Sequence, residues 1–318
     1  MKQIILITTT FILSLTSCIK DIDLSEYITS PKLVMNATLF PDRNIEVEVT
    51  RTWFIGTPKP NEAIEDAKVN LYVNEEWKEE LNHKIKEDST GKKAIYFSQY
   101  KPQSGETLRI EVSRKGFPNA SSKDIIPDVC NIKSCTTERI KNNNRLCELT
   151  IKDNPEYEDY YAIYLFYQDT VINGESVYKG FYPKVLNENL IINEEKSFID
   201  KIFDTGSHYL NYTVEPKIFN DRSFNGKDFT VSLSIYSPLR MKINADGSFY
   251  NCFMRVYTLS ESYYRFLESV LFVRGEDILK DMANQGLTDP PMVFSNVKNG
   301  AGMIGACNYY DIPIKCEV

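Results

Sequence analysis

The chain has 318 residues, of which 42% are hydrophobic and 12% aromatic, and its formal net charge is −7. This hydrophobic content is enough for packed cores, so an intrinsically disordered chain is excluded. The negative charge argues against a general nucleic-acid binder, which usually carries a basic patch. Twenty Tyr and seventeen Phe against fourteen Gly favour β-structure, in which aromatic side chains pack well.

The first element in chain order is a secretory signal. Lys2 supplies a positive charge, and the apolar stretch from Ile4 to Leu15 is shorter than the roughly 20 residues that a membrane-spanning helix needs. It runs into Leu15-Thr16-Ser17-Cys18, which resembles the lipobox of bacterial lipoproteins. We predict that residues 1–17 are removed and that the Cys18 thiol carries a diacylglyceryl group and fatty acyl chains such as palmitate. Several acyl chains make attachment to the membrane effectively permanent.

A short acidic tether, residues 18–30, follows the predicted cleavage site. Its Lys20, Asp21 and Asp23 resemble the export tag that sends some lipoproteins to the outer face of the outer membrane. The alternative is a solvated spacer, because charged residues favour disorder. We therefore expect a protein that is anchored in the outer membrane and faces the cell exterior, with the periplasmic face as the alternative.

Residues 31–127 show the pattern of a β-sandwich. Strands are predicted from Lys32 to Leu39, from Asn44 to Trp53 and from Ala67 to Val73, where apolar and polar residues alternate. Asn74-Glu75-Glu76 is a turn, and Trp77 starts the returning strand. Short strands separated by turn signals at this spacing are typical of sandwiches.

Residues 128–318 are predicted to form a second antiparallel β domain with one helix. The expected elements are strands at Arg145–Ile151, Tyr160–Asp169, Asp228–Tyr236 and Met303–Tyr310, hairpin turns at Asn173-Gly174 and Ala245-Asp246-Gly247, and a helix over 260–273. Ser260 can cap this helix, and its stripe of apolar residues indicates a core-facing side.

We expect no metal and no cofactor. Cys130-x4-Cys135-x11-Cys147 lacks a nearby histidine and the tight C-x2-C start of zinc sites. The acidic segment Asp153–Asp159 offers oxygen ligands for Ca²⁺, but it lacks the spacing and glycine of an EF-hand loop. Gly300-Ala301-Gly302-Met303-Ile304-Gly305 matches a dinucleotide motif in letters only, because a strand-like segment and not a helix follows it.

Cysteine pairing stays open at this point. Six cysteines remain besides Cys18, and outside the cytoplasm they allow both disulfides and buried free thiols. They are Cys130, Cys135, Cys147, Cys252, Cys307 and Cys316.

We also expect no catalytic residues and therefore a protein that is not an enzyme. The chain has only two histidines, His83 and His208, and no G-x-S-x-G nucleophile elbow. Its acidic pairs, such as Glu75-Glu76, are adjacent and so do not face each other across a cleft, as the carboxylates of a glycosidase must.

The segment from Asp289 to Gly305 is the candidate binding loop, because it joins the helix to the last strand and must cross the surface. The residues with suitable contact area or amide groups are Phe294, Asn296, Asn299, Tyr309 and Tyr310. The alternative is that glycines and prolines shape a bend against the sheet, with Phe294 in the core.

Several segments together resemble domain-of-unknown-function family 4249 over nearly the whole mature chain. They are Leu33–Ala37, Ile64–Tyr72, Phe224–Lys227, Ser260–Tyr264 with Leu267–Ser269, and Pro291–Val297 running into Gly305. The first domain is also similar to immunoglobulin-like and transthyretin-like modules.

The resemblance implies an outer-membrane lipoprotein, and members of this family are often encoded beside TonB-dependent receptors. It brings no known catalytic residues. We therefore expect a non-enzymatic accessory protein. It would bind either a nutrient, which is an unidentified small ligand, or a TonB-dependent transporter. The alternatives are a hydrolase acting on a surface glycan or peptide, and a structural or adhesive surface protein.

Overall fold

The computed structural model describes residues 29–54, 57–58, 63–88, 91–139, 144–172, 175–181, 184–185, 217–236, 252–275, 282–285, 287–289 and 292–314. The predicted signal peptide, Cys18 and the tag residues Lys20, Asp21 and Asp23 lie outside these ranges, as do both predicted hairpin turns and His208. Within the described ranges, no helix is long and apolar enough to cross a membrane.

The N-terminal half is a two-layer β-sandwich, as its alternating sequence predicts. One layer is the sheet β4-β3-β7-β8, and the other contains β1, β2, β6 and β5. Alternate residues of each strand point inward, such as Leu33 and Met35 from one layer and Leu108 and Ile110 from the other, and all four are fully buried. The strands are β1 (Leu33–Leu39), β2 (Glu46–Arg51), β3 (Lys68–Val73), β4 (Glu76–Glu80), β5 (Asn82–Asp88), β6 (Gly91–Phe97), β7 (Thr107–Ser113) and β8 (Ala120–Ile125).

The C-terminal half also packs two β layers, with a helix on the outer face of one of them. The sheet β13-β15-β10-β9 faces β11, β16 and β17 across a core that includes Leu149, Ile163 and Val231. The mainly β fold and the helix predicted near residues 260–273 are both confirmed. The elements are β9 (Asn131–Arg139), β10 (Asn144–Lys152), β11 (Tyr160–Ile172), β12 (Glu175–Phe181), β13 (Lys184–Val185), β14 (Lys217–Asn220), β15 (Asp228–Tyr236), β16 (Cys252–Leu259), α3 (Glu261–Gly275) and β17 (Ala301–Pro313).

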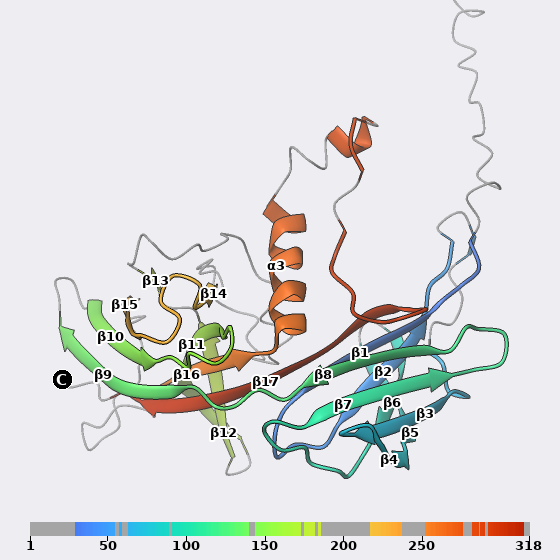
Figure 1. Ribbon diagram of the computed structural model, residues 1–318, viewed down its shortest axis with the longest axis horizontal. Coiled ribbons are helices and arrows are strands. Elements are labelled where there is room, and N and C mark those ends of the chain that lie inside the picture. Colours follow the sequence, from blue (N-terminus) through green and yellow to red (C-terminus); the bar gives the residue numbers. More distant parts are fainter. Residues whose placement is uncertain are drawn as a thin grey trace, which may run out of the picture.

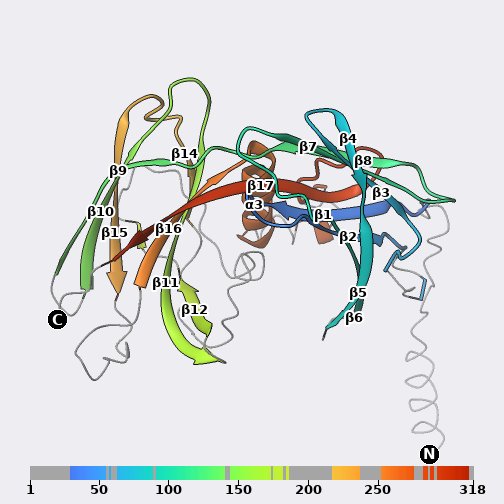
Figure 2. The same ribbon diagram turned by 90° about the horizontal axis from the view of Figure 1, so that it is seen from below.

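The last strand joins the two halves. β17 pairs in parallel with β1 through Ala301–Ala306, and it pairs antiparallel with β16 through Cys307–Pro313. A single nine-stranded sheet therefore runs through both sandwiches in the order β12-β11-β16-β17-β1-β2-β6-β5, with β14 beside β11. Figures 1 and 2 show β17, in red, extending from one half into the other.

The G-x-G-x-x-G segment belongs to this joining strand. Gly302 has φ of +99°, and a Cβ built there would lie 2.2 Å from the Met35 carbonyl oxygen. A Cβ on Gly305 would lie 2.8 Å from the Cβ of Tyr263 in α3. The glycines thus allow β17 to approach β1 on one side and α3 on the other, and the segment is followed by strand and not by helix.

A buried polar junction ties β8, α3 and β17 together. The Ser260 Oγ accepts a hydrogen bond from the Tyr263 N–H at 3.2 Å, which caps α3, and donates one to the Asp124 carboxylate on β8. The same carboxylate accepts the N–H of Ala306 at 2.9 Å. Burial, the largest cause, raises the pKa of Asp124 from 3.8 to about 7, although the hydrogen bond from Ser260 acts in the opposite direction.

Candidate binding surfaces

The predicted binding loop is fastened to the elements around it. The Asn296 amide pairs with the backbone of Ile304, donating to its carbonyl at 2.7 Å and accepting its N–H at 3.1 Å. The N–H of Phe294 donates to the Ser269 Oγ at 2.8 Å. Asn299 is exposed and has φ of +55°. Because the Asn296 amide bonds to both backbone groups of Ile304, it pairs with β17 as the backbone of a neighbouring strand would.

Tyr309 and Tyr310 lie at the other end of β17. Because Asn296 contacts Ile304, and Tyr309 comes five residues later in an extended strand, the two sites are about 16 Å apart along β17. The Tyr309 ring lies beneath the Arg255 guanidinium at 3.9 Å, and Arg255 forms a bidentate ion pair with Asp311 at 2.6 and 2.7 Å. The structure therefore places the predicted residues in two groups.

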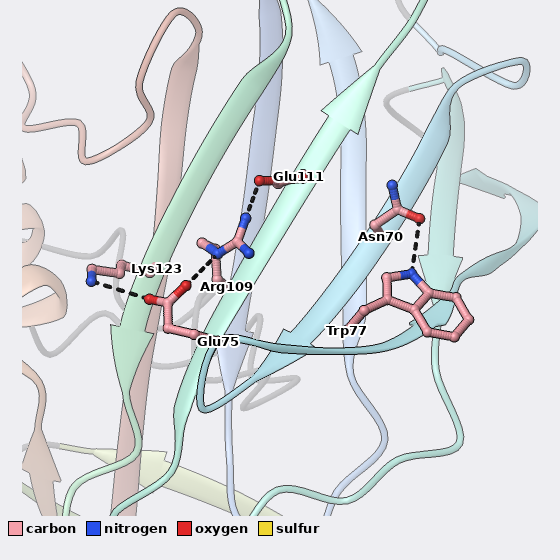
Figure 3. Close-up of polar contacts among 6 residues, drawn as sticks. All are labelled: Asn70, Glu75, Trp77, Arg109, Glu111 and Lys123. Carbon is pink, nitrogen blue, oxygen red and sulfur yellow. Dashed lines mark hydrogen bonds and ion pairs between the residues drawn. The ribbon is translucent and has the colours of Figure 1, made fainter.

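The outer face of the sheet β4-β3-β7-β8 presents a row of four large side chains, one from each strand. Trp77 is paired in register with Tyr72, Tyr72 with Arg109, and Arg109 with Lys123. We call these residues the Trp77 row. Trp77 is 61% exposed, and its indole N–H points to the Asn70 Oδ1 at 3.5 Å (Figure 3). The row is an aromatic and cationic strip across the four strands, and the pairing of β3 with β4 shifts register between Leu71 and Tyr72.

Acidic neighbours fix the cationic end of the Trp77 row. The Arg109 Nε donates to the Glu75 carboxylate at 2.8 Å, and the Lys123 ammonium lies 3.4 Å from the other Glu75 oxygen (Figure 3). Arg109 also pairs with Glu111. The hydrogen bond from Arg109, followed by that from Lys123, lowers the pKa of Glu75 below its ordinary value. The guanidinium of Arg109 in turn stacks on the Tyr72 ring, with 3.6 Å to its centroid.

Such a row is suited to binding a large partner. Trp, Tyr and Arg are the residue types most enriched at the energetic centres of protein interfaces. Side chains that are already held by neighbours lose less conformational freedom on binding. The sequence identified Trp77 only as the start of a strand, although a tryptophan within a run of charged residues was a usable signal.

The cysteines and histidines in the described ranges form no recognisable catalytic group. Cys130, Cys135, Cys147 and Cys307 are free thiols, and the Cys135 and Cys147 sulfurs lie 3.5 Å apart on the paired strands β9 and β10. His83 is exposed on β5 beside the Tyr96 ring.

Three carboxylates, those of Asp153, Asp159 and Asp221, lie close enough together to share a metal ion. The sequence pointed to Asp153 and Asp159 as oxygen donors. It gave no sign of Asp221, which lies far along the chain from them.

These features define a mainly β protein of two sandwiches joined by one sheet, with an exposed aromatic row on its first half. The chain belongs to the family described as Domain of unknown function (DUF4249), whose model matches residues 19–312. No curated protein matches the sequence. Among solved structures, a chimeric titin Z1Z2-Z1Z2 tandem carrying a GRGDS peptide from fibronectin is similar at 12% identity and a TM-score of 0.17, over 74% of this chain and 93% of that chain.

Proposed function

We propose that the protein is a lipid-anchored outer-membrane lipoprotein that faces the cell exterior and acts as a non-enzymatic accessory to a TonB-dependent transporter. The lipobox ending at Cys18 supports the anchor, and the segment Lys20–Asp23 supports display on the outer face. Members of the family are often encoded beside TonB-dependent receptors, which supports the choice of partner.

The observation that carries the binding role is the Trp77 row. A small nutrient is usually held in a concave site that buries most of its surface. The Trp77 row instead lies on the outer face of a sheet, where the indole of Trp77 is 61% exposed. This geometry supports a macromolecular partner over a small ligand.

The binding role is tested by affinity capture from detergent-solubilised outer membranes. The tagged full-length protein should retain a TonB-dependent receptor, identified by mass spectrometry, and Trp77→Ala should weaken retention about tenfold or more because interface tryptophans are typical hot spots. Trp53→Ala is the matched control, since Trp53 is the other tryptophan and is also exposed. Equal retention by wild type and Trp77→Ala, or recovery of no such receptor, would contradict the proposal.

The anchor and its orientation are tested separately. Cys18→Ala should release the protein or leave it with an uncleaved signal, whereas equal partitioning into detergent by the wild type and a variant whose signal has been removed would rule out the anchor. Replacing Lys20, Asp21 and Asp23 together by Ala should hide the protein from protease added to intact cells. Unchanged cleavage would reduce this segment to a tether.

A further inference from the structure

Three strand ends in the C-terminal half bring carboxylates together. Asp153 follows β10, Asp159 precedes β11, and Asp221 follows β14. One carboxylate oxygen from each lies within 4.8 Å of the others. Asp153 and Asp159 line a cavity of about 350 Å³ that is also bordered by Asp128, Tyr157 and Thr258, so two of the three residues border an open cavity.

The hydrogen bonds of the three carboxylates leave one buried oxygen without a partner. Asp153 accepts the Tyr161 hydroxyl and the Gly226 N–H, both at 2.8 Å. The Asp221 Oδ2 accepts the Asp159 N–H at 2.9 Å. Asp221 is fully buried, and its Oδ1 has no hydrogen-bond partner among the described residues. A buried carboxylate oxygen without a hydrogen-bond partner is costly, so this one points to a ligand-binding role for the cluster.

The charge of the cluster is also uncompensated. Within the described ranges, no Lys, Arg or His forms an ion pair with any of the three carboxylates; Arg222, which follows Asp221, pairs with Glu158 at 2.5 Å. Burial, followed by the charges of Asp153 and Asp221, raises the pKa of Asp159 to about 6. A positive ion between the three side chains would remove this repulsion.

We propose that Asp153, Asp159 and Asp221 bind a Ca²⁺ ion. All three donors are hard carboxylate oxygens, which select calcium, magnesium or manganese over softer metals. Calcium takes 6–8 oxygen ligands in flexible geometry, whereas magnesium demands near-ideal octahedral geometry. Three carboxylates from three separate strand ends, with the adjoining cavity supplying water, suit the more flexible ion.

The ion would clamp the two layers of the C-terminal sandwich. Asp153 follows a strand of the sheet β13-β15-β10-β9, whereas Asp159 and Asp221 lie directly beside the ends of β11 and β14 in the nine-stranded sheet. The turn after Asp221 already lies against the segment that begins at Asp153: the Gly226 N–H donates to the Asp153 carboxylate, and a Cβ built on Gly226 would lie 2.8 Å from the Pro155 Cβ. Ca²⁺ would thus join the two sheets at the edge where their connections cross.

Thermal unfolding and terbium luminescence test the site on the full-length protein in detergent. After treatment with a chelator, millimolar CaCl₂ should raise the melting temperature by about 5 °C or more, as expected for a ligand that binds only the folded state. Matched MgCl₂ or NaCl should have a smaller effect. Tb³⁺ should show emission sensitised by Tyr161, whose hydroxyl contacts both Asp153 and Asp159, and Ca²⁺ should displace it.

The variants Asp221→Asn and Glu156→Gln separate a cation site from a merely acidic surface. With chelator present, Asp221→Asn should melt at or above the wild-type temperature because it relieves repulsion, and with Ca²⁺ the wild type should become the more stable. Glu156→Gln removes an exposed charge from the same loop and should behave as wild type. Absence of a calcium-dependent shift and of sensitised terbium emission in the wild type would overturn the proposal, as would equal calcium affinity in Asp221→Asn. Stabilisation by magnesium and not by calcium would overturn the choice of ion.

Discussion

Replacing Asp124 by Asn tests how the two halves of the molecule are joined. The Asp124 carboxylate is 9% exposed and links β8 to Ser260 and Ala306, and burial raises its pKa from 3.8 to about 7. The lower value applies to the unfolded chain and the higher value to the folded protein, so between pH 3.8 and about 7 the folded protein binds more protons. The free energy of unfolding therefore falls as the pH rises from about 4 to about 7, and by about 4 kcal/mol when the change is complete.

The Asn side chain removes this titration and introduces one mismatch. Its amide nitrogen must face the N–H of either Ala306 or Ile125, both of which now donate to the carboxylate. We therefore expect Asp124→Asn to be less stable than wild type by about 1–3 kcal/mol at low pH. Between low pH and about pH 8, the free energy of unfolding of the variant should rise by about 4 kcal/mol relative to that of the wild type, because only the wild type carries the buried charge at the higher pH.

Urea unfolding followed by circular dichroism across this pH range measures the difference. Asp289→Asn is the control, because it makes the same substitution at an exposed position. If the difference between wild type and Asp124→Asn is constant across the range, Asp124 does not titrate as a buried group and the reasoning is refuted.

Three further outcomes follow from the packing of β17 and from the cysteines. Gly302→Ala should destabilise the fold by about 3 kcal/mol or more through backbone strain and a clash with β1, whereas Gly116→Ala, with φ of +88° but open space around it, should cost about 1–2 kcal/mol in equilibrium unfolding. Asn296→Ala should lower the free energy of unfolding by about 2 kcal/mol because two hydrogen bonds to β17 are lost. An unchanged stability would show that these hydrogen bonds are not structural and would favour a binding role for Asn296. A thiol oxidant should join Cys135 to Cys147, as seen by peptide mapping, because their sulfurs lie 3.5 Å apart; persistence of both thiols would contradict this.

Local pattern predicted several elements of this fold closely. The strand expected from Asp228 to Tyr236 is observed with the same bounds, and the helix expected over 260–273 begins at Glu261. Alternation and capping are properties of neighbouring residues, so a single sequence displays them. The sandwich of the first half followed from the same spacing.

Long-range pairing was not visible in the sequence. Nothing in Ala301–Ala306 specifies a parallel partner at the opposite end of the chain, and the need for Gly302 appears only once Met35 lies beside it. For the same reason the sequence did not group Asp221 with Asp153 and Asp159, because Asp221 reaches Asp153 only through the folding of two sheets. From the sequence alone we expected no metal.

Photo-crosslinking in intact cells tests whether the Trp77 row contacts a TonB-dependent receptor. A photoreactive amino acid placed at position 77 lies in the Trp77 row, and one placed at exposed Glu87 on β5, in the other layer of the sandwich, is the control. We expect a crosslink to a TonB-dependent receptor from position 77 and little or none from position 87. No receptor crosslink from position 77, or equal crosslinking from both positions, would contradict it.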